Sequence, residues 1–138
     1  MAIRNFLYDA GFLKSTTFEK PVILVGNLST GGTGKSPHVA YLVDMLRSNY
    51  KVATLSRGYG RKTVGFLEAD ESKNYKDIGD EPMLFFTKYP DVKVYVDEKR
   101  TRGVEKILKE NQKAEVILLD DCYQHRWIKA GLNILLLD

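Results

Sequence analysis

The sequence predicts an α/β domain in which a parallel β-sheet lies between two layers of helices. Short apolar segments that suit strands alternate with longer segments whose apolar residues have helical spacing. The strand segments are apolar along their whole length, as expected when both faces of a parallel sheet are covered. With 138 residues, of which 43% are hydrophobic, the chain suits a single globular core.

Composition narrows the class of protein further. The net charge of +3 is mild, so it permits an anionic partner but gives no reason to expect nucleic acid. The single cysteine, Cys122, excludes an internal disulfide framework and fits a reducing cytosol. No apolar run approaches the roughly 20 residues that a membrane-spanning helix needs.

The chain is expected to divide into an amphipathic N-terminal segment, residues 1–20, and an α/β core, residues 21–138. Within the first segment, residues 3–13 carry apolar side chains at helical spacing. This stripe predicts a short helix that either covers an edge of the core or lies at a membrane interface. Its members are Ile3, Phe6, Leu7 and Ala10.

The core segments follow in order. Strands are expected at residues 22–25, 51–56, 91–97, 115–121 and 132–138, with a short extra strand within 64–70. Helices are expected at 38–48 after Pro37, at 81–89 with Pro82 in the first turn, and at 99–111 with Val104, Ile107 and Leu108 facing inward. The polar stretch 70–80 predicts a surface loop. Because no helix follows the last apolar strand, we expect the architecture to continue in a second lobe that this chain lacks.

A glycine-rich loop joins the first expected strand to the first core helix. The stretch "GNLSTGGTGKSPH" resembles the phosphate-binding pattern G-x-x-x-x-G-K-[ST], but Ser29 stands where the first glycine is usual. Three glycines near the lysine let the backbone N–H groups surround phosphate oxygens. This predicts a P-loop NTPase-like domain that binds a nucleotide, the alternative being a chance glycine-rich turn. The loop residues are Ser29, Thr30, Gly31, Gly32, Thr33, Gly34, Lys35 and Ser36.

Acidic residues supply the candidates for metal binding and proton transfer. Asp120 and Asp121 end a buried strand, where a carboxylate can hold Mg²⁺ beside a phosphate loop or can merely cap a turn. Asp80 and Glu81 precede or begin a helix, so they are either an N-cap with a first-turn acid, or a catalytic base and a metal ligand. Spacing alone does not separate these alternatives.

The sequence gives weaker indications of function for the basic residues than for the acidic ones. Arg57 and Arg61 flank the glycines of "SRGYGRK", which suits an anion site or a solvated turn. Arg100 and Arg102 begin a helix, where the dipole disfavours cations, so surface solvation is the default and an outside anionic partner the alternative.

Taken together, "VGNLSTGGTGKSP", "LSRGYGR", "GDEP" and "LLDDCYQHR" closely resemble the tetraacyldisaccharide 4'-kinases, the lipid A 4'-kinases of Gram-negative bacteria. The resemblance runs from about Ile3 to Asp138, and the variant opening at Ser29 is shared with the family. It implies phosphorylation of the 4'-hydroxyl of a disaccharide lipid precursor by ATP, at the cytoplasmic face of the inner membrane.

The resemblance also implies roles for single residues. Ser29 to Ser36 would hold the ATP phosphates, and Asp80 would accept the proton of the sugar hydroxyl. Mg²⁺ would be held by Ser36, Glu81, Asp120 and Asp121. Four residues match family positions near the cleft with less certain roles: Arg57, Arg61, Arg100 and His125.

Two features depart from the family pattern. Cys122 stands where the family usually has glycine. The family's second lobe, which the resemblance says supplies a histidine that supports the aspartate, is expected to be missing from this chain. The ATP-binding lobe alone is therefore expected to be inactive. The rival interpretations are another P-loop protein, GTPase-like or metallochaperone-like, and a non-enzymatic interaction domain. The absence of N-K-x-D counts against the first, and the presence of Lys35 with the strand-end acids counts against the second.

Overall fold

A computed structural model describes residues 2–3, 10, 18–27, 35–120 and 131–136 of the chain. The elements along the sequence are β1 (Val22–Asn27), α2 (Lys35–Arg47), β2 (Val52–Ser56), β3 (Leu67–Glu68), α3 (Tyr75–Ile78), α4 (Asp80–Lys88), β4 (Lys93–Val96), α5 (Arg100–Glu110), β5 (Val116–Asp120) and β6 (Leu132–Leu136). Every strand predicted from the apolar runs is present, including the short extra strand, which is β3.

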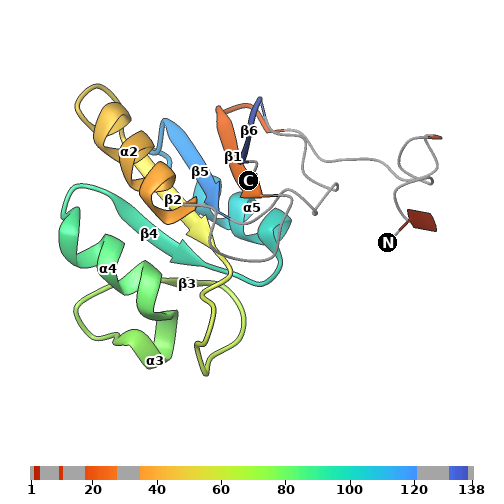
Figure 1. The fold of residues 1–138 in the computed structure, drawn as a ribbon. Coiled ribbons are helices and arrows are strands. Elements are labelled where there is room, and N and C mark those ends of the chain that lie inside the picture. The colour runs from red at the N-terminus through yellow and green to blue at the C-terminus, as the bar shows by residue number, and fades with distance from the viewer. Residues whose placement is uncertain (1, 4–9, 11–17, 28–34, 121–130, 137–138) are drawn as a thin grey trace.

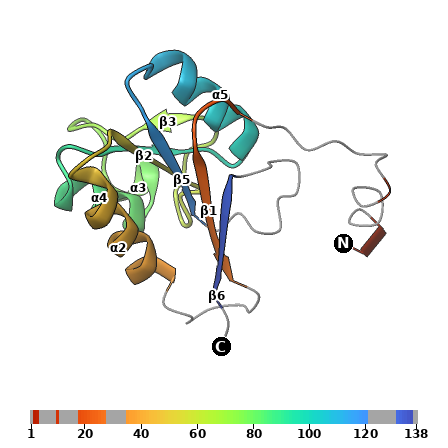
Figure 2. The ribbon, with the colours of Figure 1, turned by 90° about the horizontal axis from the view of Figure 1, so that it is seen from above.

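The strands form one six-stranded sheet in the order β3-β4-β2-β5-β1-β6 (Figure 1). Five of them pair in parallel, and β3 is added antiparallel to β4 at one edge. α2 and α4 cover one face of the sheet and α5 covers the other, which confirms the predicted three-layer α/β arrangement (Figure 2).

Each face of the sheet has its own core. On the α5 side, Val104 and Ile107 are fully buried against Leu55 and other strand residues, and Leu108 packs at the margin. On the other side, Val39 and Val43 of α2 pack with residues of α3, α4 and the strands. The inward positions expected for Val104, Ile107 and Leu108 are confirmed. Fully burying such a side chain contributes about 1.5–3 kcal/mol.

The stretch 70–80 differs from the surface loop that its polarity predicted, because it contains the helical turn α3. A capping box holds this turn: the Asn74 side chain accepts from the Lys76 N–H at 2.8 Å, and the Asp77 carboxylate accepts from the Asn74 N–H at 2.9 Å. Ile78 anchors the turn in the core with no exposed surface. One buried apolar residue among polar ones has no periodicity, which is why the pattern was missed.

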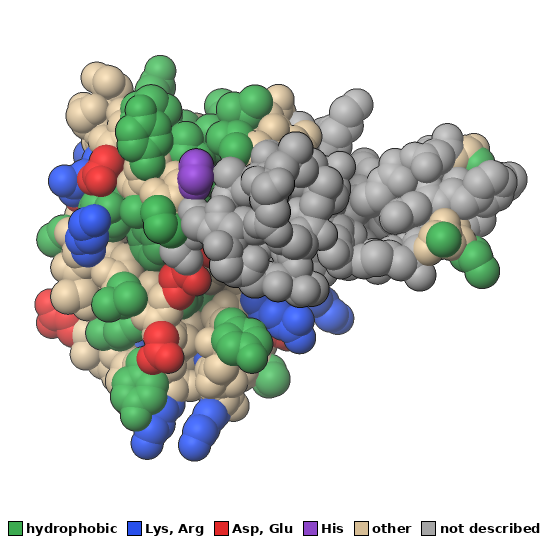
Figure 3. Space-filling view, viewed as in Figure 1, with side chains coloured by type: hydrophobic (Ala, Val, Ile, Leu, Met, Phe, Trp, Pro, Cys, Tyr) green, Lys and Arg blue, Asp and Glu red, His purple; other side chains and the backbone are tan. Residues whose placement is uncertain are grey.

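The N-terminal amphipathic helix lies almost wholly outside the described residues, and it stays a prediction. Among the helices that the structure describes, none combines the length and the apolar character needed to cross a bilayer. Basic, acidic and hydrophobic side chains are interspersed on the face shown in Figure 3.

Candidate functional site

The carboxyl ends of the parallel strands bring the sequence motifs to one edge of the sheet. β1 and β5 are neighbours in the sheet. The strand that follows β1 in sequence, β2, lies on one side of this pair, and the strand that follows β5, β6, lies on the other side. In α/β sheets a ligand crevice forms at such a divergence. The divergence lies between Asn27, where the glycine-rich loop begins, and Asp120.

The glycine-rich loop itself, residues 28–34, lies outside the described residues. The strand and the helix that flank it are present as predicted, but β1 runs two residues further, to Asn27, and α2 begins at Lys35 instead of after Pro37, which lies in its first turn. The backbone of Lys35 and Ser36 therefore forms the N-terminus of a 13-residue helix, a position that favours anions. The phosphate contacts of these residues remain a prediction.

Asp80 and Glu81 are the first two residues of α4. The residue that caps this helix is Gly79, with φ of 96° and no side-chain bond, so the interpretation of Asp80 as the N-cap is wrong and that of a first-turn acid is confirmed. Asp80 is exposed. Glu81 is partly buried, and its buried Oε1 atom has no hydrogen-bond partner among the described residues. An orphaned carboxylate oxygen suits a cation ligand.

A groove of about 380 Å³ between α2 and α4 connects these acids to the start of α2. Pro37 and Ala40 form one wall, next to the Lys35–Ser36 turn, while Asp80 and Glu81 form part of the other. The remaining lining is mainly apolar, from Leu84, Phe85, Lys88 and Tyr89. The groove thus brings together two motifs that are more than 40 residues apart in the sequence.

Asp120 ends β5, opposite Val25 of β1 in the parallel register, and is 8% exposed. It therefore lies beside the strand that leads into the glycine-rich loop. Asp121 and His125 fall outside the described residues. Within the described part of the chain, no three His, Cys, Asp or Glu side chains cluster as a metal site, so the predicted ligand set is not tested.

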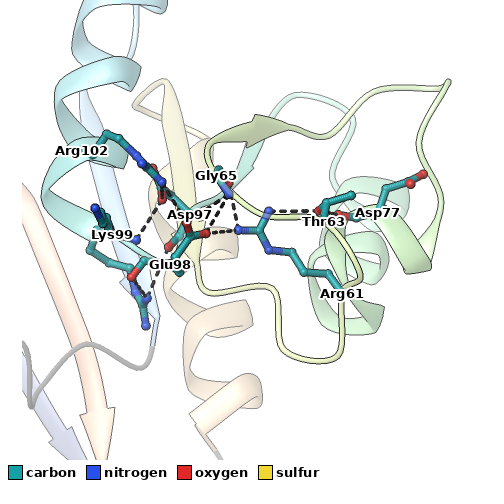
Figure 4. A network of polar contacts seen from close by, with 9 residues as sticks. Arg61, Thr63, Gly65, Asp77, Asp97, Glu98, Lys99 and Arg102 are labelled. Atoms are coloured by element: carbon teal, nitrogen blue, oxygen red, sulfur yellow. Dashed lines mark hydrogen bonds and ion pairs between the residues drawn. The ribbon is translucent and has the colours of Figure 1, made fainter.

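Arg57 and Arg61, which looked alike in the sequence, have different surroundings. Arg57 is exposed and lines a hollow of about 420 Å³ with Tyr59 and Val64. The Arg61 side chain is 5% exposed, and its guanidinium contacts Glu98 at 2.6 Å and donates to the Gly65 carbonyl at 2.9 Å (Figure 4). Burial lowers the pKa of Arg61, although the negative charges of Glu98 and Asp97 act to raise it. In the structure, the anion that Arg61 contacts is therefore the Glu98 carboxylate of the same chain.

The expectation of surface solvation is wrong for Arg100, which is 2% exposed. Its Nη1 donates to the backbone carbonyl of Glu98 at 2.8 Å and to that of Asp97 at 3.3 Å. Arg102 makes a bidentate ion pair with the fully buried Asp97, at 2.9 and 2.6 Å. These acids and carbonyls, placed just before the helix, offset the unfavourable dipole.

Comparison with known proteins agrees with this arrangement. The model of a family described as tetraacyldisaccharide-1-P 4'-kinase matches residues 1–138. The chain belongs to this family.

Individual members of the tetraacyldisaccharide-1-P 4'-kinase family are similar over nearly the whole chain. Curated tetraacyldisaccharide 4'-kinases of Flavobacterium johnsoniae and Bacteroides thetaiotaomicron are 58% and 51% identical, covering 98% and 100% of this chain. The chain spans 40% and 37% of their respective lengths. A crystal structure of LpxK from Aquifex aeolicus, described as an "apo" form in complex with ATP, has a TM-score of 0.89 at 44% identity. That alignment covers 97% of this chain and 43% of the other.

Asp97 and Glu98 are the residues of this region that motif analysis missed. Glu98 accepts the Gly65 N–H at 2.9 and 3.1 Å and Arg102 Nη2 at 3.0 Å, besides Arg61. Partial burial raises the pKa of Glu98. This effect is outweighed by hydrogen bonds from its own backbone N–H, from Gly65 and from Arg102, and by the positive charge of Arg61. Together they lower the pKa to about 2. The available signal was the run "VDEKRTR", in which acids after a strand precede three basic residues.

Proposed function

We propose that this chain is the ATP-binding lobe of a lipid kinase that phosphorylates the 4'-hydroxyl of a tetraacyldisaccharide 1-phosphate, a lipid A precursor. The observation that carries the proposal is the groove between α2 and α4, which places Asp80 and Glu81 beside the turn that follows the glycine-rich loop. A kinase needs an acceptor-activating carboxylate near the γ-phosphate, and the shared groove supports that role for Asp80.

In the proposed reaction, the loop Ser29 to Ser36 holds the ATP phosphates through its backbone N–H groups and Lys35. The 4'-oxygen bonds to the γ-phosphorus while the bond to the β-phosphate oxygen breaks, and ADP leaves. Asp80 takes the proton of the hydroxyl group. Its side chain is exposed, so an acceptor molecule can reach the carboxylate.

Ser36, Glu81, Asp120 and Asp121 would hold Mg²⁺, which supplies neutralisation of the phosphate charge. The orphaned Glu81 Oε1 and the position of Asp120 beside β1 fit this set. Arg57 and His125 are further candidates for contacts to substrate in the cleft.

The acceptor is a lipid, so the site must reach a bilayer surface. We propose that the protein acts peripherally at the cytoplasmic face of the bacterial inner membrane, with residues 1–20 as one contact. The exposed side chains of Arg57, Tyr59 and Lys62, on the glycine-rich turn after β2, suit an anionic headgroup region.

Nucleotide binding can be tested on this chain alone, by its thermal midpoint with and without Mg²⁺-ATP. A ligand that binds only the folded state at about 100 times its Kd adds roughly 2.7 kcal/mol to the free energy of unfolding, so the midpoint should rise. The rise should vanish in Lys35→Ala and persist in Lys109→Ala, which removes an equivalent charge from the exposed last turn of α5. Mg²⁺-GTP should give a smaller rise. Equal rises for Lys35→Ala and the unaltered chain would contradict a phosphate loop at this position.

A further inference from the structure

The turn that precedes Asp80 is packed directly against the glycine-rich loop after β2. A Cβ atom on Gly79 would lie 2.9 Å from the Tyr59 carbonyl oxygen, and one on Gly58 would lie 2.6 Å from the Ile78 carbonyl oxygen. Both glycines have positive φ, of 96° and 73°. The two backbones are therefore closer than side chains would allow, and the position of one sets the position of the other.

Hydrogen bonds join the same two segments further along. The Lys62 N–H donates to the Lys76 carbonyl at 2.7 Å, and the Thr63 hydroxyl donates to the Asp77 carbonyl. The loop thus contacts Lys76, Asp77 and Ile78 of α3, and Ile78 is followed directly by Gly79 and Asp80.

The other end of the loop is held by Glu98, which follows β4 (Figure 4). Its carboxylate accepts from the Gly65 N–H and from Arg61, while Arg61 closes the loop through Gly65 and Thr63 at 2.9 and 3.2 Å. Glu98 is in turn fixed by Arg102 of α5. An unbroken series of contacts therefore runs from Glu98 through Arg61 and the loop to Gly79.

We infer that Glu98 is a positioning residue for Asp80: it anchors residues 57–65, and these hold the turn at Gly79 that places Asp80 in the wall of the groove. The inference rests on the proposed function, because that function gives Asp80 its catalytic role. Glu98 lines no part of the groove itself, and it acts only through the loop.

The test follows Gly79 and Asp80 by NMR on this chain, without substrate. In Glu98→Ala, amide exchange should accelerate at least about tenfold at Gly65, because its charge-assisted bond to Glu98 is lost. Exchange should accelerate as well at Lys62 and Gly79, because the loop is no longer anchored. The Asp80 carboxyl ¹³C resonance should shift. The amides of β5 should keep their exchange rates, which shows that the fold is intact.

Two further variants make the result specific. Glu68→Ala is the matched control, since Glu68 has the same 37% side-chain exposure and pairs with Lys93 at 3.1 Å, away from the loop. It should leave Gly79 and Asp80 unchanged. Glu98→Gln keeps an oxygen that can accept from Gly65 and Arg61, so it should return the Gly79 exchange rate towards that of the unaltered chain.

Changes confined to residues 61–65 would overturn the inference, because Glu98 would then anchor only its own loop. A Glu98→Gln variant as perturbed at Gly79 as Glu98→Ala would overturn it too. The readout needs neither nucleotide nor lipid, so a failure of the kinase proposal would appear in the ATP measurement and not here.

Discussion

Gly58→Ala is expected to lower the free energy of unfolding by about 2–5 kcal/mol, a large effect for one methyl group. Positive φ costs a residue with a Cβ roughly 1–2 kcal/mol. The new Cβ would also lie 2.6 Å from the Ile78 carbonyl oxygen, a backbone atom that cannot move without displacing α3. Such overpacking costs about 1–3 kcal/mol more. Urea denaturation at constant m-value measures the difference.

Gly60→Ala is the matched control for this experiment. Gly60 also has positive φ, of 80°, but a Cβ there would meet no atom within 4 Å. It should therefore cost only the conformational part, about 1–2 kcal/mol. Equal losses in the two variants would mean that the contact between residue 58 and the α3 segment is looser than described.

The second large effect is expected for Asp97→Ala. The Asp97 carboxylate is fully buried and accepts three bonds, two from Arg102 and one from the Lys99 N–H at 2.9 Å. Its loss leaves the Lys99 N–H, at the residue before α5, and the Arg102 guanidinium without the carboxylate that accepts from them. The Arg102 side chain is 36% exposed, so only the Asp97 side of the pair is buried. Leaving hydrogen-bonding groups without their partner costs about 1–3 kcal/mol, and more for charged groups. A lowered urea midpoint with unchanged m-value would record it.

An exposed ion pair of the same length offers the comparison. Arg47 contacts Asp91 at 2.6 Å, as Arg102 contacts Asp97, but the Asp91 side chain is 51% exposed. Asp91→Ala should cost less than about 1 kcal/mol. If both aspartate variants lost the same stability, burial would not be the reason for the importance of Asp97.

The predictable part of the fold was the part set by apolar runs and helical periodicity. Strands such as β1 and β5 are apolar along their length, and their burial on both faces follows. The turn α3 was missed because a capping box and a single buried isoleucine hold it, and neither produces a period. The sheet order, with β5 between β1 and β2, depends on contacts distant in sequence and could not be predicted from local patterns.

The candidate site also has a part that the sequence could predict and a part that it could not. The motifs located Asp80, Glu81 and Asp120, because acids at helix starts and strand ends have recognisable spacing. The motifs could not show that Arg61 is used internally while Arg57 is exposed, since both flank the same glycines. That difference depends on Glu98, which reaches the loop from another strand of the sheet. Long-range pairing of charges leaves no local pattern.

We expect nucleotide phosphates to bind at the start of α2, within reach of Asp80, Glu81 and Asp120. The most direct measurement is NMR line broadening by Mn²⁺-ATP, in which Mn²⁺ replaces Mg²⁺ and broadens nearby amides. We predict broadening at the first turn of α2, at residues 80–81 and at Asp120, and none at the last turn of α5. The broadening should exceed that of Mn²⁺ alone and disappear in Lys35→Ala. Broadening that spares Asp80 and Glu81, or that survives in Lys35→Ala, would contradict the account.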